Sequence, residues 1–143
     1  MSVGWLAEHG DEPDVRVFDV TVQVSRVLMV PRIRTGAREY RAGHIPGSGF
    51  IDLLTVHDPA RPKLTMTAPT PEHFAAAVGA AGLGSEHRVV LYDRRDSMWA
   101  ARLWWLLRVF GHEQAAILDG GWAPGRPPAT RSAPAGAATR RPP

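Results

Sequence analysis

The chain has 143 residues, enough for one domain whose hydrophobic core can fold without disulfides or bound metal ions. Apolar residues make up 44% and charged residues 22% of it, which excludes a fibrous or wholly disordered chain. It has no cysteine, which excludes disulfides, zinc–cysteine sites, iron–sulfur clusters and thiol nucleophiles. No apolar run approaches the roughly 18 residues of a membrane span. The N-terminus lacks a basic segment ahead of an apolar stretch, so we expect a cytoplasmic protein with no membrane partner.

The positive charge is concentrated at the C-terminal end. The net charge is +3, yet residues 123–143 hold four arginines and no acid, while residues 1–121 hold thirteen basic and fourteen acidic side chains. A nucleic-acid footprint needs a basic face on the folded domain, so we expect no nucleic-acid partner. The same tail holds six of the thirteen prolines and no large apolar residue. We therefore predict a domain over residues 1–122 and a disordered tail over 123–143.

Short elements are predicted along the first half of the chain. These are a helix over 3–9 with Ser2 as its N-cap, a strand over 15–18, a helical turn or two over 37–42, a short strand over 49–51 and a loop over 58–69. Residues 22–30 add a further strand. Pro31 is expected to end it, because proline cannot donate to a strand ladder.

The second half predicts a strand–helix–strand unit. Thr70 and Pro71 are a cap and a first-turn proline for a helix over 71–81. The unit itself has an apolar strand over 89–92, a helix over 98–110 and a second strand over 115–118. Continuous apolar strands are typical of a parallel sheet, and this spacing predicts a right-handed crossover. The expected fold class is α/β, with a central parallel sheet and helices on both faces.

The loop between the strand over 89–92 and the following helix is the candidate site. Its residues are Asp93, Arg94, Arg95, Asp96 and Ser97. Ligands of open parallel sheets bind beyond the carboxyl ends of the strands. Backbone N–H groups of such a loop, together with the N-terminus of the next helix, form a cradle for an anion.

Five ordered regions of the chain carry a family resemblance. They are residues 15–20, residues 39–48 with their Gly-His-Ile-Pro-Gly run, residues 89–93, residues 99–112 and residues 117–122. Together they resemble the rhodanese family, and more narrowly the N-terminal half of its two-domain thiosulfate and 3-mercaptopyruvate sulfurtransferases. The resemblance implies a rhodanese-like fold over residues 2–122.

In that family a cysteine at the start of this loop carries a persulfide between a sulfur donor and a thiophilic acceptor. Asp93 stands at that position, and a carboxylate cannot form a persulfide. In the two-domain enzymes the catalytic cysteine lies in the C-terminal half. The resemblance thus implies a domain without a catalytic residue or cofactor, whose residues 93–97 form a vestigial pocket.

The partner that the resemblance implies is a C-terminal catalytic rhodanese domain. The intact enzyme would transfer sulfane sulfur from thiosulfate or 3-mercaptopyruvate to cyanide or a thiol. A second interpretation is a free-standing inactive rhodanese module that binds a protein or an anion through the 93–97 loop. It requires that this chain form a complete fold alone.

Other chemical readings of the carboxylates are weaker. Asp93 as a phosphate-accepting nucleophile lacks a partner acid with Mg²⁺-binding spacing, so we expect it to accept amide bonds where the persulfide would sit. Asp19 and Thr21 resemble an aspartyl-phosphatase loop, but its second aspartate is absent.

His44 is expected to hydrogen-bond within its turn, and the scattered histidines predict no metal site. Arg94 and Arg95 are expected to be solvated.

Two features of the sequence concern whether the expected rhodanese-like domain is complete. The helix over 98–110 is apolar nearly all round, so its outer face is either part of a thick core or a patch for a partner domain. Family members continue past Trp122 into a further helix, whereas residues 123–130 here read Ala-Pro-Gly-Arg-Pro-Pro-Ala-Thr. We expect a truncated domain whose tail over 123–143 is an out-of-frame reading of a GC-rich gene.

Overall fold

The structure is a computed structural model that describes residues 1–58, 60 and 68–122. The tail predicted over 123–143 lies outside the described residues. So do residues 59 and 61–67 of the loop predicted over 58–69. Within the described part, no helix is both long and apolar enough to cross a membrane.

A four-stranded parallel sheet forms the centre of the fold. Its order is β4 (Gly49–Phe50), β1 (Val15–Asp19), β5 (Arg88–Tyr92) and β6 (Ala115–Ile117), and each neighbouring pair is parallel. Parallel neighbours need crossover connections, and α4 (Met98–Val109) supplies the one between β5 and β6. The predicted α/β class with a central parallel sheet is confirmed.

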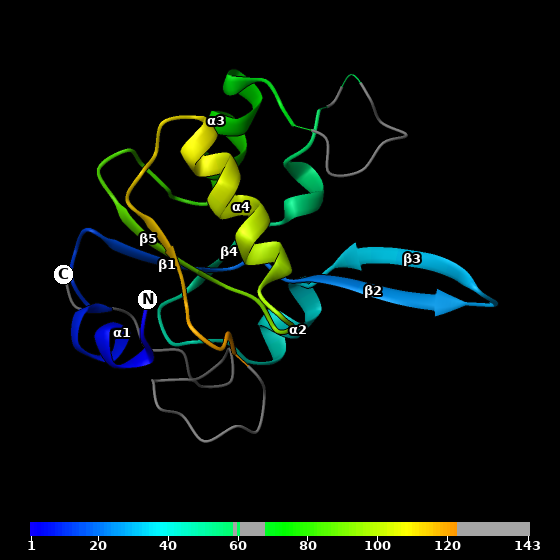
Figure 1. Ribbon diagram of the computed structural model, residues 1–143, viewed down its shortest axis with the longest axis horizontal. Helices are drawn as coiled ribbons and strands as arrows, with labels where there is room; N and C mark the ends of the chain where they lie inside the picture. Colours follow the sequence, from blue (N-terminus) through cyan, green and yellow to red (C-terminus); the bar gives the residue numbers. More distant parts are fainter. Residues whose placement is uncertain (59, 61–67, 123–143) are drawn as a thin grey trace.

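Helices cover both faces of this sheet (Figure 1). On one face α3 (Pro71–Ala80) and α4 pack with the short 3₁₀ helix η1 (Leu53–Thr55). On the other face lies α1 (Val3–His9). The remaining helix, α2 (Ala37–Ala42), leads into β4. The predicted caps are present, since Ser2 Oγ accepts from the Trp5 amide at 3.0 Å and Thr70 Oγ1 from the His73 amide at 3.2 Å.

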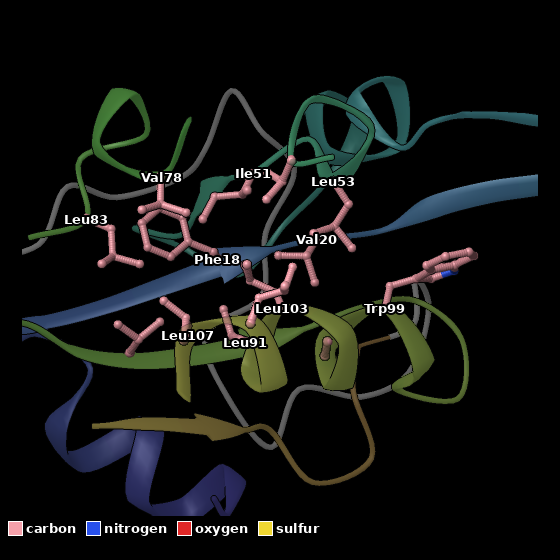
Figure 2. Close-up of a cluster of buried hydrophobic side chains, with 14 of the residues drawn as sticks. Phe18, Val20, Ile51, Leu53, Val78, Leu83, Leu91, Trp99, Leu103 and Leu107 are labelled. Carbon is pink, nitrogen blue, oxygen red and sulfur yellow. The ribbon is translucent and has the colours of Figure 1, made fainter. Parts of the chain in front are cut away.

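The side chains of β5 alternate between the two faces. Val89 and Leu91 belong to the cluster under α3 and α4, whereas Val90 and Tyr92 belong to the cluster under α1. Figure 2 shows Leu91 beside Leu103 and Leu107 of α4. This two-sided burial explains why the strand reads as a continuous apolar run rather than an alternating one.

An antiparallel hairpin stands apart from the sheet and projects beyond the rest of the described chain (Figure 1). It consists of β2 (Val22–Val27) and β3 (Val30–Thr35), and we call residues 22–35 the arm. The prediction that Pro31 ends the strand is wrong, because Pro31 lies inside β3 opposite Arg26. A two-stranded hairpin has only edge strands, so a proline fits where its nitrogen points away from the partner strand.

The outer face of α4 is partly uncovered. Leu103 is fully buried against the sheet, but Met98, Trp105 and Val109 are each about half exposed, at 49%, 48% and 52%. The outer face of this helix therefore carries an exposed apolar patch, and its use by a partner domain stays a prediction.

Burial differs enough along α4 to predict two contrasting stabilities. Leu103→Ala should lower the free energy of unfolding by about 2–5 kcal/mol, because it leaves a cavity in the core. Val109→Ala, on the exposed face of the same helix, should cost less than about 1 kcal/mol. Urea unfolding followed by tryptophan fluorescence measures both. Equal losses for the two variants would contradict this packing.

Candidate functional site

Asp93 follows β5 at the carboxyl edge of the sheet and is completely buried, with 0% exposure. Its Oδ1 accepts hydrogen bonds from the backbone amides of Arg95 (2.9 Å) and Ser97 (3.1 Å). Its Oδ2 accepts from the amides of Trp99 and Ala100, both at 3.0 Å. The expected amide bonds are thus present. The charge lies at the N-terminus of α4, where the helix dipole favours an anion.

The backbone around this carboxylate is tightly constrained. Ser97, the last residue before α4, has a left-handed conformation with φ of 68°. Gly121 has φ of 59°, and a Cβ there would lie 2.7 Å from the Asp93 carbonyl oxygen. The Trp122 amide donates to that same oxygen at 3.1 Å. The segment after β6 therefore closes over Asp93, and only glycine fits at position 121.

Arg94 is not solvated, which corrects the expectation from sequence. Its side chain is only 7% exposed, and its Nε donates to Oδ2 of the fully buried Asp19 at 3.2 Å. Its Nη2 donates to the Gly43 carbonyl, and its guanidinium lies 4.1 Å from the ring centroid of Trp122. The neighbouring strand β1 ends in an acid at this edge, so the arginine turns inward to neutralise it. Arg95 and Asp96 are exposed.

Burial raises the pKa of the Asp19 carboxyl, against the effect of hydrogen bonds from Thr21 and the charge of Arg94. The Thr21 amide and hydroxyl both donate to Asp19 Oδ1, at 2.9 and 2.6 Å. Every oxygen of this buried acid therefore has a partner within the domain. A buried ion pair of this kind is strongly destabilising to break from one side.

A second polar network joins β5 to the Gly-His-Ile-Pro-Gly turn. The Tyr92 hydroxyl accepts from the Ile45 amide at 3.2 Å and lies 3.0 Å from Ser48 Oγ. Burial raises the pKa of Tyr92 well above its ordinary range, so the phenol stays protonated at neutral pH. His44 Nδ1 lies 2.9 Å from the Tyr40 carbonyl, and the two rings stack with centroids 4.0 Å apart. His44 therefore has the structural role expected of it, but its hydrogen-bond partner lies in α2 and not within its own turn, which corrects that part of the expectation.

The chemistry available at this edge is limited. The chain has no cysteine, and the Asp93 carboxylate already accepts four hydrogen bonds from backbone amides. Across residues 1–58, 60 and 68–122, no group of three His, Asp or Glu side chains is placed to hold a metal ion.

The structure does not bring all five predicted site residues into one site. Asp93, Ser97 and the Arg95 backbone belong to the amide cradle, whereas Arg94 turns away to Asp19. Asp19 was missed as a partner of this loop. Its signal was present, because it ends a strand at the same edge as Asp93, and parallel register places Asp19 opposite Tyr92.

Comparison with known proteins identifies the family. Residues 2–124 match the rhodanese-like domain, and the chain belongs to that family. The resemblance stated from the sequence is therefore confirmed, in both the family and its narrower branch.

The relatives that the chain resembles are sulfurtransferases. It is 38% identical over 119 residues to the 3-mercaptopyruvate sulfurtransferase of Escherichia coli K12, covering 83% of this chain and 41% of that protein. It is 39% identical over 121 residues to the mitochondrial thiosulfate/3-mercaptopyruvate sulfurtransferase 1 of Arabidopsis thaliana, covering 85% and 30%. The crystal structure of the E. coli 3-mercaptopyruvate sulfotransferase SseA matches with a TM-score of 0.70 at 37% identity, over 85% of this chain and 45% of that one. The chain thus spans less than half the length of these relatives.

The cradle predicts the effect of removing the carboxylate. Asp93→Ala leaves four amides without their acceptor and should lower the free energy of unfolding by about 3 kcal/mol. Added formate should restore part of that stability, because it supplies a carboxylate of similar size. Thermal unfolding in rising formate concentration measures this. Asp96→Asn, in the exposed part of the loop, keeps the side-chain oxygen that accepts from the Met98 amide at 3.3 Å. It is the matched control and should show neither effect. Formate that stabilises wild type and Asp93→Ala equally would contradict the cradle.

The buried ion pair predicts a pH-dependent loss. Arg94→Gln removes the cation beside Asp19 and should cost about 3–5 kcal/mol at neutral pH. Loss of that cation raises the pKa of Asp19 further, so the deficit is full above this pKa and shrinks as falling pH protonates the acid. Urea unfolding between pH 5 and 8 tests the trend. Arg95→Gln, the exposed neighbour, should stay within about 0.5 kcal/mol of wild type throughout. A deficit for Arg94→Gln that grows on acidification would contradict the pairing.

Proposed function

We propose that this chain is the non-catalytic, N-terminal rhodanese-like part of a longer two-domain sulfurtransferase, and that it transfers no sulfur by itself. The observation that carries the proposal is the occupied cradle. Asp93 holds the position and the amide donors that a persulfide-forming cysteine would need, and the chain has no thiol. The partial coverage of the sulfurtransferase relatives supports a partner domain on the same polypeptide.

In such an enzyme the chemistry belongs to the partner domain. A cysteine thiolate there attacks the sulfane sulfur of thiosulfate, sulfite leaves with the electron pair of the broken sulfur–sulfur bond, and the persulfide then passes its outer sulfur to cyanide or a thiol. With 3-mercaptopyruvate as donor, the carbon–sulfur bond breaks, its electron pair leaves with the carbon fragment as the enolate of pyruvate, and the enolate takes up the proton of the donor thiol. In this proposal the chain has a supporting role, and its buried Asp19 and Arg94 neutralise each other at the carboxyl edge of the sheet.

The alternative is an inactive rhodanese module that binds a protein or an anion through residues 93–97. The anion form has little support, since four amides already donate to Asp93 and Arg94 is paired with Asp19. The protein form retains the exposed side chains of Arg95 and Asp96 as contacts. This form predicts no affinity for a catalytic rhodanese domain.

The two candidates differ in a mixing experiment. The probe is the segment of the E. coli 3-mercaptopyruvate sulfurtransferase that lies outside its match with this chain, made as a separate polypeptide. We expect the chain alone to release no sulfite from thiosulfate and no pyruvate from 3-mercaptopyruvate. We expect it to bind the probe and to raise the probe's turnover. Turnover by the chain alone, or no complex with the probe, would overturn the proposal.

The same cradle predicts the properties of an introduced thiol. In Asp93→Cys the four amides and the N-terminus of α4 should stabilise a thiolate, and its pKa should fall below the ordinary value of about 8.5. The pH dependence of iodoacetamide alkylation, followed by mass spectrometry, measures that pKa. Ser85→Cys, exposed in the segment between α3 and β5 of the same otherwise cysteine-free chain, is the control and should titrate near the ordinary value. Equal titration of both thiols would show that the cradle does not stabilise an anion.

A further inference from the structure

A cavity of about 480 Å³ lies at the amino edge of the sheet, where β5 and β6 begin. Its walls come from α3, from the C-terminal end of α4 and from the segments that lead into these two strands. Asp93 lies at the carboxyl edge, and none of the described residues 93–97 lines the cavity. The volume falls within the range of small-molecule sites, about 300–1,000 Å³.

The floor of this cavity is apolar and aromatic. Phe74 of α3 and Leu107 of α4 are buried there, with 4% and 1% exposure. The ring of Phe74 stacks on that of the partly buried Phe110, with centroids 4.6 Å apart. Figure 2 shows Val78, Leu83 and Leu107 gathered at one end of the core cluster. Because the core holds these side chains, the floor is a preformed apolar surface.

One polar atom in the cavity wall has no partner. At the end of α4, Gly111 has φ of 90° and the His112 amide donates to the Leu107 carbonyl at 2.8 Å. The residue that follows the left-handed glycine in such a turn usually supplies an apolar contact with the helix. Here it is histidine, and its Nε2 is shielded from solvent with no hydrogen-bond partner in the described part of the chain. A polar atom in this state is costly unless a bound group completes its hydrogen bond.

The charges around the cavity favour a neutral ligand. Glu113 is the acidic side chain among the described residues that line it, and that lining includes no lysine or arginine. An anion would meet this exposed carboxylate with no cation to offset the repulsion. The lining therefore suits a ligand with an apolar aromatic body, no charge, and one group that forms a hydrogen bond with His112.

Thiosulfate and 3-mercaptopyruvate, after which the relatives are named, are anions and do not suit this lining. They would face Glu113 without a lysine or arginine among the described residues around the cavity. The cavity is therefore not a further site for a sulfur donor, and its ligand belongs to a different chemical class.

We propose that this cavity binds a neutral aromatic alcohol, a compound of one or two rings that bears a hydroxyl group. Its rings lie against Phe74 and Phe110, where aromatic pairs gain energy beyond the area they bury. Its hydroxyl completes the hydrogen bonding of His112 Nε2, because a hydroxyl both donates and accepts and so fits either tautomer of the imidazole. The inference does not rest on the proposed function, since the cavity and the Asp93 loop share no residue.

The probe is 2-naphthol, an aromatic alcohol that is uncharged at neutral pH. It is titrated into the full, isotope-labelled chain, and binding is followed by the amide chemical shifts. We expect saturable shifts at Ser85, Gly111 and His112, with little change at Ser97 and Trp99. Naphthalene-2-sulfonate has the same rings and a negative charge, and it should bind about tenfold more weakly or worse.

Two variants of α3 test the place of binding. Ala75→Leu fills the cavity from an exposed position without removing any core atom, so the affinity for 2-naphthol should fall about tenfold or more. Ala76→Leu is the matched control, because Ala76 is exposed on the same helix but does not line the cavity. Its affinity should stay within about threefold of wild type. Leucine is a good helix former, so both variants should fold.

His112→Phe tests the hydrogen bond. It keeps an aromatic ring and removes Nε2, so the melting temperature should be unchanged or higher, because a shielded polar atom without a partner is lost. Wild type should prefer 2-naphthol to 2-methylnaphthalene, which has a similar shape, by about threefold to tenfold. In His112→Phe this preference should disappear.

The outcomes separate the site from its ligand. If no saturable shifts appear around the cavity, or if Ala75→Leu and Ala76→Leu bind 2-naphthol equally well, the site is overturned. If the sulfonate binds as tightly as 2-naphthol, or if His112→Phe keeps the preference for the hydroxyl, the assigned ligand class is overturned. The proposed function is tested separately, by the mixing experiment with the unmatched segment of the E. coli relative.

Discussion

One buried carboxylate organises the carboxyl edge of this domain. Asp93 gathers the amides of the loop and of the first turn of α4, so the loop path and the start of the helix depend on one side chain. The chain after β6 then closes over the Asp93 carbonyl, where only Gly121 fits. Removing the acid would release the loop and the first turn of α4, because buried amides without an acceptor are costly. The contact with Trp122 uses the main-chain carbonyl of Asp93 and would remain.

The same interaction explains why the amide cradle has no donors left for an added anion. An amide cradle at a helix N-terminus binds whichever anion occupies it, and here the anion is covalently part of the chain. The pair formed by Asp19 and Arg94 closes the adjoining part of the edge in the same way, with the guanidinium stacked on Trp122. The rhodanese-like fold is present, and a side chain of the protein itself occupies the amide cradle at this edge. The exposed apolar surfaces, on the arm and on α4, lie outside this closed unit.

Sequence patterns predict the parts of the fold in which a strong local signal agrees with the tertiary environment. The apolar run of β5 and the capped helix α3 are such parts, because burial on two faces and helix capping both leave a recognisable residue pattern in the sequence. The hairpin is different. Its apex is Leu28–Met29 rather than Asn-Gly, and Pro31 argues for a break, so the local signals oppose the structure. The inward turn of Arg94 depends on a residue 75 positions away, which no local pattern reveals.

The central claim is that Asp93 already occupies the amide cradle, and amide hydrogen exchange tests it most directly. In the folded wild-type chain, the amides of Arg95, Ser97, Trp99 and Ala100 should exchange slowly, and in Asp93→Ala those of Arg95 and Ser97 should lose this protection. The amides of Trp99 and Ala100 should show the same loss in the first turn of α4. Protection that is absent in wild type, or unchanged by the substitution, would contradict the account.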